Sequence, residues 1–220
     1  MAELISGLSA ERVCANLAEV RERIAAAAAR AGRDGADIEL VVAGKYVAVE
    51  DLAVLAQAGI EIIGENRAQD LQAKIAAYGD TFTWDFIGHL QSRKVKLVAP
   101  RVRLIHSVSS DSVLEQLGRH APDGLRVLVE VDVAGEEAKS GLAPAELPAF
   151  LERCPVPVAG LMTMAPRAEQ PEDSRRWFAA LRELGEAHDL AALSMGTTQD
   201  YEVAVEEGAT HVRIGSRLFR

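Results

Sequence analysis

The chain alternates between short apolar segments and amphipathic segments of helical spacing, and this alternation restricts its fold more than any other feature. The apolar segments are rich in β-branched residues and too short for most helices, so we expect strands there. They lie at residues 38–45, 60–64, 83–88, 103–108, 126–133, 156–164, 191–195 and 211–215. We expect helices between them, at 49–58, 67–78, 92–98, 110–120, 144–152, 171–188 and 200–207.

Strands that alternate with helices in this way predict a parallel sheet with right-handed crossovers. Eight such strands fit a single closed (β/α)8 TIM barrel over residues 1–220, because no linker rich in Pro, Gly or Ser divides the chain. An open doubly wound sheet is the alternative, but the turn at 44–47 (GKYV) lacks the Gly-rich phosphate fingerprint of that fold. An additional N-terminal helix at 10–31, capped by Ser9, is available to cover the place of the missing eighth helix.

Charge and cysteine content argue against several classes of protein. The chain has 24 basic and 33 acidic residues, a net charge of −9, so we expect no general affinity for nucleic acid or anionic membranes. Cys14 and Cys154 belong to no metal-binding or disulfide pattern. Residues 1–13 carry acids where a signal peptide needs bases, and no apolar segment is long enough to span a membrane, so we expect a cytoplasmic protein.

Lys45 lies at the carboxyl end of the first expected strand, and these ends form the active face of a barrel. A lysine kept partly out of water there has a lowered pKa, and its neutral amine is a nucleophile towards aldehydes. A solvated lysine at a strand end is the alternative. Other expected strand ends also carry polar residues, among them Glu65, His106, Asp132 and Thr163.

Two loops near the end of the chain have the composition of a phosphate site. Barrels frequently bind phosphate in the loops after strands seven and eight. The segment Ser194-Met195-Gly196-Thr197-Thr198 is small and hydroxyl-rich and leads into a helix near Asp200, and Gly215-Ser216 follows the last strand. Helix capping by Thr198 or Asp200 is the alternative interpretation of the first loop.

Arg213 lies two residues before Gly215 and therefore shares one face of the last strand with it. An arginine that faces into a barrel needs a partner, which would be a heteroaromatic ring nitrogen, a bound carboxylate, or an ion pair with Glu65 or Asp132. Together with a lysine and a phosphate cradle, this arginine suggests pyridoxal 5'-phosphate (PLP), held by Lys45 as a Schiff base. An arginine would leave the ring nitrogen unprotonated, which makes the ring a weaker electron sink.

Two histidines, His89 and His106, also lie at expected strand ends. Each can pack beside a ring or make structural hydrogen bonds, and general acid–base catalysis is the alternative. We count His89 among the cofactor-binding residues. No two histidines have metal-ligand spacing, so we expect no metal site. We assign no catalytic residue.

Six blocks of the sequence resemble the YggS/PROSC-type family of PLP homeostasis proteins and follow one another in the order of that family. They are residues 64–69 (GENRAQ), 84–94 (WDFIGHLQSRK), 105–108 (IHSV), 160–166 (GLMTMAP), 193–196 (LSMG) and 212–216 (VRIGS). The resemblance extends over nearly the whole chain. It implies a barrel similar to the N-terminal domain of alanine racemase.

The resemblance also implies roles for individual residues. Lys45 would carry the cofactor, Asn66 would lie beside its ring, and Arg213 would face the ring nitrogen. The phosphate would be held by Ser194, Met195, Gly215 and Ser216. The chain departs from the family at Gly44, where a serine is common, and at Thr197-Thr198, where Met-Ser is more usual.

A protein of this resemblance would handle intracellular PLP, with PLP-dependent apoenzymes as candidate partners. The alternatives are a racemase-like PLP enzyme acting on amino acids, and a barrel that binds a phosphorylated metabolite without a cofactor. A two-base racemase needs an acid or base on each face of its substrate. Tyr46, which follows Lys45, is expected to point away from it on a continuing strand, and Tyr78 and Tyr201 offer no clear replacement. We therefore expect a monomeric carrier without robust catalysis.

Overall fold

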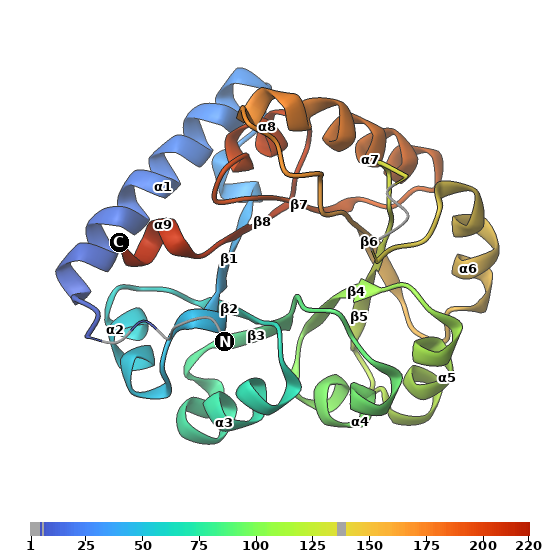
Figure 1. The fold of residues 1–220 in the computed structure, drawn as a ribbon, viewed down its shortest axis with the longest axis horizontal. Coiled ribbons are helices and arrows are strands. Elements are labelled where there is room, and N and C mark those ends of the chain that lie inside the picture. The colour runs from blue at the N-terminus through green and yellow to red at the C-terminus, as the bar shows by residue number, and fades with distance from the viewer. Residues whose placement is uncertain (1–4, 6, 136–139) are drawn as a thin grey trace.

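Eight parallel strands form a closed barrel in the computed structural model, which describes residues 5, 7–135 and 140–220 (Figure 1). The strands are β1 (Glu39–Ala43), β2 (Ile62–Glu65), β3 (Thr83–Phe86), β4 (Leu104–Val108), β5 (Arg126–Glu130), β6 (Val158–Met162), β7 (Ala192–Thr197) and β8 (His211–Ile214). Each strand pairs with the next, and β8 pairs with β1. The predicted TIM barrel is confirmed, and the open sheet is wrong.

Helices surround the barrel and bury one apolar face each against the strands (Figure 1). They are α1 (Ala10–Arg30), α2 (Leu52–Gln57), α3 (Ala68–Tyr78), α4 (Val95–Val98), α5 (Asp111–His120), α6 (Leu147–Arg153), α7 (Arg175–Ala187), α8 (Tyr201–Glu206) and α9 (Ser216–Phe219). Several predicted helices begin with a separate 3-10 turn. The turn Val49–Asp51 before α2 is an example. No helix in the described part of the chain is both long and apolar enough to cross a membrane.

The first helix takes the place of the missing eighth helix, as the sequence predicts. Ser9 caps α1 by accepting a hydrogen bond from the Arg12 N–H, at 3.4 Å. The helix lies against α8 and the short α9, and all three gather on one side of the barrel (Figure 1). The Asn16 side chain donates to the carbonyl oxygens of Leu218 and Arg220, which ties α1 to the C-terminal end of the chain.

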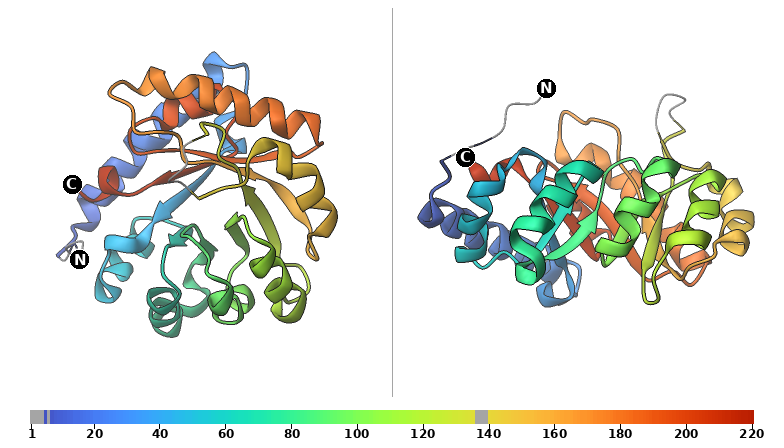
Figure 2. Two further views of the ribbon diagram at one scale, coloured as in Figure 1. Left: turned by 45° about the vertical axis from the view of Figure 1, so that its right-hand side comes forward. Right: turned by 90° about the horizontal axis from the view of Figure 1, so that it is seen from below.

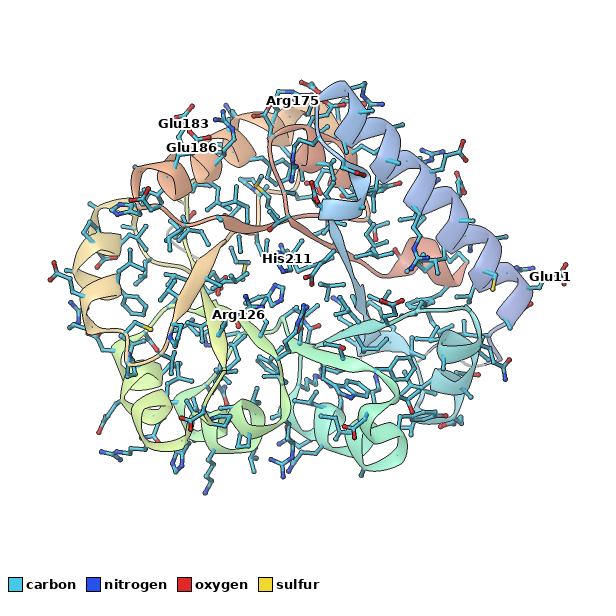
Figure 3. The ribbon with its side chains drawn as sticks, turned by 180° about the vertical axis from the view of Figure 1, so that it is seen from behind. Glu11, Arg126, Arg175, Glu183, Glu186 and His211 are labelled. Carbon is cyan, nitrogen blue, oxygen red and sulfur yellow. The ribbon has the colours of Figure 1, made fainter. Side chains whose placement is uncertain are left out.

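The inside and the outside of the barrel differ in polarity. Side chains alternate across each strand, so that Trp84, Ile105 and Val212 face the helices and join the main apolar core. The inward positions include a small apolar cluster, formed by Leu104, Leu128 and Met162. Many other inward residues are polar and buried, among them Asp85, His106, Ser194, His211 and Arg213. Figure 3 shows His211 near the middle of the barrel.

Loops at the carboxyl ends of the strands form the mouth of the barrel. The loop between β6 and α7, residues 163–170, extends from this end when the barrel is seen from the side (Figure 2). Strand β1 is shorter than predicted, because it ends at Ala43 and the chain continues as a 3-10 turn, Gly44–Tyr46. Lys45 is therefore carried by a tight turn and not by the strand.

Candidate functional site

The turn that carries Lys45 is held from both sides. The Val47 N–H bonds to the Gly44 carbonyl oxygen within the turn, at 2.8 Å, and Ile5 donates its N–H to the Tyr46 carbonyl oxygen, at 2.7 Å. The Lys45 side chain is exposed, which agrees with the alternative of a solvated lysine and not with partial burial. Its Nζ lies 4.7 Å from the centre of the Tyr46 ring. The prediction that Tyr46 points away from Lys45 is wrong, because the strand does not continue.

A buried ion pair lies directly beneath this turn. Lys74, on α3, places its Nζ 2.7 Å from the Gly44 carbonyl oxygen and in close contact with Glu65. The side chains of Lys74 and Glu65 are only 4% and 0% exposed. Burial raises the pKa of Glu65, and Lys74 offsets part of that rise. Glu65 therefore faces α3 and not the mouth, where the sequence places it.

The same ion pair explains the glycine before Lys45. A Cβ atom at Gly44 would lie 2.8 Å from Oε1 of Glu65 and 2.9 Å from Cγ2 of Ile63, closer than packed atoms allow. Position 44 therefore has no room for a side chain as long as Glu65 and Ile63 keep these positions.

Asn66 and His89 lie beside Lys45 on one cavity of about 630 Å³. Lys74 and Gln91 also line it. The Oδ1 atom of Asn66 is buried and has no hydrogen-bond donor among the described residues, whereas His89 is exposed. A buried acceptor without a donor costs free energy unless a ligand or water completes it. The residues that line the Lys45 cavity therefore include one buried acceptor without a donor.

Arg213 points inward from β8 and is 6% exposed. Its Nη1 donates to the carbonyl oxygen of Ser194, at 2.8 Å, and to the hydroxyl oxygen of the same residue. Its Nη2 donates to the Thr163 carbonyl oxygen, at 2.9 Å, and to the Met164 sulfur, at 3.0 Å. The alternative of an ion pair with Glu65 or Asp132 is wrong. Burial lowers the pKa of Arg213 to about 10, so the guanidinium is still a cation at neutral pH.

Three more residues extend from Arg213 across the barrel interior. The Ser194 hydroxyl lies 2.8 Å from Nδ1 of His106, and Nε2 of His106 lies 3.3 Å from Oδ2 of Asp85. Strands β4 and β7 are not neighbours, so the Ser194–His106 contact crosses the interior. We call Asp85, His106, Ser194 and Arg213 the interior network. Ser194 therefore turns its hydroxyl into the barrel, and Met195 packs into the core outside it.

The loop after β7 lies close to the turn after β8. Asp200 accepts from the Thr197 N–H at 2.7 Å, and Thr198 accepts from the Gly215 N–H at 3.3 Å. Neither bond caps α8, because Asp200 is its N-cap residue but accepts no N–H of the helix, so the alternative of helix capping is wrong. In the described part of the chain the N–H groups of Thr198 and Ser216 have no acceptor. These two donors are available to an anion.

Glycine is required at one position of this loop. Gly196 has φ +87°, and a Cβ atom there would lie 2.5 Å from the Cβ of Ala204. Gly215 brings its turn against β1, since a Cβ atom on it would lie 3.3 Å from the Cβ of Ala43. Because β1 and β8 are paired, the Lys45 turn and the Gly215 turn emerge side by side.

Four of the eight predicted site residues line two separate cavities, whereas Ser194, Met195, Gly215 and Ser216 line neither of them. Lys45, Asn66 and His89 line the first cavity, and Arg213 lines a second of about 650 Å³ with the β6–α7 loop. Sequence reasoning missed Asp85, Lys74 and Met164. An isolated acid between two aromatic residues within a strand was a usable signal for Asp85, whereas nothing in the sequence marked Met164 as a partner of Arg213.

Comparison with known proteins identifies close relatives of this chain. Residues 15–220 match the family described as alanine racemase, N-terminal domain. The pyridoxal phosphate homeostasis protein of Aquifex aeolicus is 41% identical over 220 residues, which cover 94% of this chain and 96% of that protein. The relative of the same name from Pseudomonas aeruginosa is 36% identical over 217 residues, 94% of each chain.

Two solved structures are similar to this chain over nearly its whole length. The structure of PipY from Synechococcus elongatus with PLP bound has a TM-score of 0.79 and 29% identity, over 94% of this chain and all of that one. An unknown protein from Bifidobacterium adolescentis has a TM-score of 0.86 and 30% identity, over 99% of this chain and 98% of that one.

Proposed function

The chain belongs to the family of pyridoxal phosphate homeostasis proteins, and from this premise we propose that it binds PLP covalently on Lys45 as a carrier of the cofactor. The observation that supports this most directly is the pairing of β1 with β8, which brings the Lys45 turn beside the Gly215 turn. A lysine amine and a loop with free N–H groups then lie at one mouth, as a phosphorylated aldehyde requires.

The residues present fit this cofactor. The unpartnered Oδ1 of Asn66 can accept a hydrogen bond from a ring substituent, and the N–H groups of Thr198 and Ser216 can donate to phosphate. The glycine at 196 leaves room for the loop backbone to approach an anion closely. Bound there, PLP supplies an aldehyde that an amine holds reversibly as a Schiff base, with loss of water.

We assign Lys45 the role of covalent anchor and Arg213 that of partner to the ring nitrogen. Arg213 can only donate hydrogen bonds and keeps its own proton, so it would leave that nitrogen unprotonated. A ring of this kind withdraws electrons weakly. This supports a protein that stores or delivers PLP without robust catalysis.

The positions of the tyrosines favour the carrier over the racemase-like enzyme. The Tyr78 hydroxyl accepts from the Ala53 N–H between α2 and α3, and Tyr201 is buried in the core. Tyr46 lies against the Lys45 amine, on the same side as the first base. Two-base racemisation needs its second group on the opposite face of the substrate.

We further propose that the working form is a cytoplasmic monomer that delivers PLP to PLP-dependent apoenzymes. Cys14 and Cys154 are both unpaired, as is usual in a reducing compartment. Light scattering at micromolar concentration would test the monomer, and transfer of PLP to an apoenzyme in dialysis-separated and mixed samples would test delivery.

Covalent attachment to Lys45 is tested by absorbance. We expect the purified protein with added PLP to develop a band in the visible region that borohydride fixes onto the peptide containing Lys45. Lys45→Ala should abolish the band and remain folded, because the side chain is exposed and makes no buried contact. Lys96→Ala, at an exposed lysine of α4, is the matched control and should keep the band.

Three results would count against the proposal. A band that survives in Lys45→Ala would remove the lysine assignment. A protein that stays colourless with excess PLP would leave only a phosphate-binding barrel, whereas steady racemisation of an amino acid by the loaded protein would favour the enzyme.

A further inference from the structure

Arg213 is an unusual buried cation, because no carboxylate lies within hydrogen-bond distance of it in the described part of the chain. Four bonds from its two terminal nitrogens end on neutral acceptors, supplied by Ser194, Thr163 and Met164. Burying a charge with neutral partners is costly unless those partners are firmly oriented. The orientation of the Ser194 hydroxyl therefore matters to the position of the guanidinium.

The direction of the hydrogen bonds in the interior network follows from what each group can donate. A guanidinium only donates, so the Ser194 oxygen accepts from Arg213 and its own hydrogen is free for Nδ1 of His106. Nδ1 is then an acceptor, and a neutral imidazole carries its proton on Nε2, towards Asp85. Burial lowers the pKa of His106 despite the nearby carboxylate, which agrees with the neutral form.

Asp85 closes the network as a fixed anion. Arg103 donates to both of its carboxylate oxygens, at 3.1 and 2.8 Å, and also to Glu39. Burial alone would raise the pKa of Asp85, but the hydrogen bonds from His106 and Arg103 bring it below its ordinary value. Every hydrogen between Arg213 and Asp85 thus points in one direction, towards the carboxylate.

Serine, histidine and aspartate in contact also make up a hydrolytic triad, but that interpretation fails here. All three side chains are completely buried, and the serine oxygen is already occupied by Arg213. No substrate can reach the hydroxyl. The network instead ends on the one member that borders a cavity, Arg213.

We propose that His106 is a positioning residue that fixes the Ser194 hydroxyl as an acceptor and thereby holds Arg213 where the ring nitrogen of PLP would lie. This proposal rests on the function proposed above. The buried side chains of the barrel interior would then hold the Arg213 guanidinium in one orientation, so that its N–H groups point in a fixed direction towards the cofactor.

The test compares two buried histidines of the same interior. The rings of His106 and His211 lie 5.7 Å apart, but the His211 ring bonds to Thr210. His211 pairs with Ser194 through the backbone of β7 and β8, and no hydrogen bond joins their side chains among the described residues. We would load His106→Phe and His211→Phe with PLP and record the absorbance spectrum from pH 6 to 9, together with the PLP dissociation constant. Circular dichroism would confirm that each variant is folded.

We expect His106→Phe to retain borohydride-fixed PLP on Lys45, with a shifted absorbance band whose pH dependence differs from that of the wild type. Its affinity for PLP should fall roughly tenfold, the size expected for one lost hydrogen bond to a charged group. His211→Phe should match the wild type in both. Ser194→Ala should reproduce the His106→Phe spectrum, and the double variant should add nothing further.

A conservative variant distinguishes a positioning role of His106 from a role in packing alone. His106→Asn keeps an oxygen that can accept from Ser194 and should restore most of the wild-type spectrum. If His106→Phe does not fold, Ser194→Ala and His106→Asn decide the question. An unchanged spectrum in His106→Phe or Ser194→Ala, or an equal shift in His211→Phe, would overturn the proposal. Absence of PLP on Lys45 in the wild type would instead overturn the proposed function.

Discussion

The Lys45 side and the Arg213 side of the barrel mouth each present a cation, yet the two are held in opposite ways. Lys45 is exposed on a single 3-10 turn, with its amine 4.7 Å from the centre of the Tyr46 ring. Arg213 is 6% exposed on a strand and has four hydrogen bonds. A group that must make and break a covalent bond needs freedom, whereas a group that recognises one atom of a ring needs a fixed direction.

The support beneath each cation differs as well. Below Lys45 lies an ion pair, Glu65–Lys74, which holds the backbone of the turn and leaves the lysine side chain free. Behind Arg213 lies the interior network, which holds the side chain itself. The fold therefore restrains the backbone at the Lys45 turn and the side chain at Arg213.

The largest effect is expected from breaking the ion pair. Glu65→Gln keeps the shape of the side chain but leaves the Lys74 cation buried without a counter-charge. We expect a loss of about 3–5 kcal/mol in the free energy of unfolding, because an unpaired buried charge is not compensated. Urea denaturation followed by circular dichroism would measure it.

An exposed ion pair provides the control for this prediction. Glu115 and Arg119 on α5 are 60% and 61% exposed, so Glu115→Gln should cost about 0–1 kcal/mol. Equal losses in the two variants would show that the Glu65–Lys74 pair does not support the Lys45 turn.

Lowering the pH should reduce the free energy of unfolding, and we expect the first loss at His211, which lies on β8 with Arg213. Burial lowers the pKa of His211 to about 4, below the value near 6.5 that a histidine has in the unfolded chain. Between these two values the unfolded chain binds a proton that the folded barrel does not, so the free energy of unfolding falls as the pH falls. The expected loss from His211 alone is roughly 3 kcal/mol by pH 4.

Urea unfolding at pH 7, 5.5 and 4.5 would reveal this loss, and the step from pH 7 to 5.5 lies above the range in which ordinary carboxylates titrate. His211→Asn removes the titrating group and should flatten the dependence on pH. A wild-type protein equally stable at pH 7 and 4.5 would contradict the prediction.

The smallest effect is expected at Met164, whose sulfur accepts from Arg213 although the side chain is 48% exposed. A thioether is a weak acceptor, so removing it frees one N–H of the guanidinium at little cost. Met164→Ala should tighten PLP binding about two- to fivefold, equivalent to less than 1 kcal/mol, and leave the unfolding midpoint unchanged. Equilibrium titration with PLP would check this, and weaker binding would indicate that Met164 contacts the cofactor.

Much of the fold was predictable because its signals are local. The apolar periodicity correctly placed all eight strands and the covering helix at 10–30, and the absence of a Gly-rich turn correctly excluded the open sheet. Strand ends were less accurate. The first strand was extended by two residues, since nothing in the local sequence shows that the chain turns at Gly44 once Lys74 captures its carbonyl oxygen.

The site divides in the same way. Lys45, Arg213 and the glycines of the two last loops were identifiable in the sequence, because chemistry at a barrel mouth requires those residue types at strand ends. The sequence did not show how deeply each of these side chains is buried. Partial burial and full solvation were both open for Lys45, which is exposed, and nothing in the sequence indicated that the Ser194 hydroxyl faces His106.

By itself, then, the sequence determined the eightfold barrel, the family and the residues at the mouth, since each depends on the order of side chains along the chain. Only the tertiary structure decided which cation is exposed and which is buried. That difference depends on partners that are distant in the chain: 9 positions for Lys74–Glu65, 30 for Lys74–Gly44 and 88 for Ser194–His106. Closure of the sheet brings these groups together, and burial then makes each hydrogen bond costly to lose.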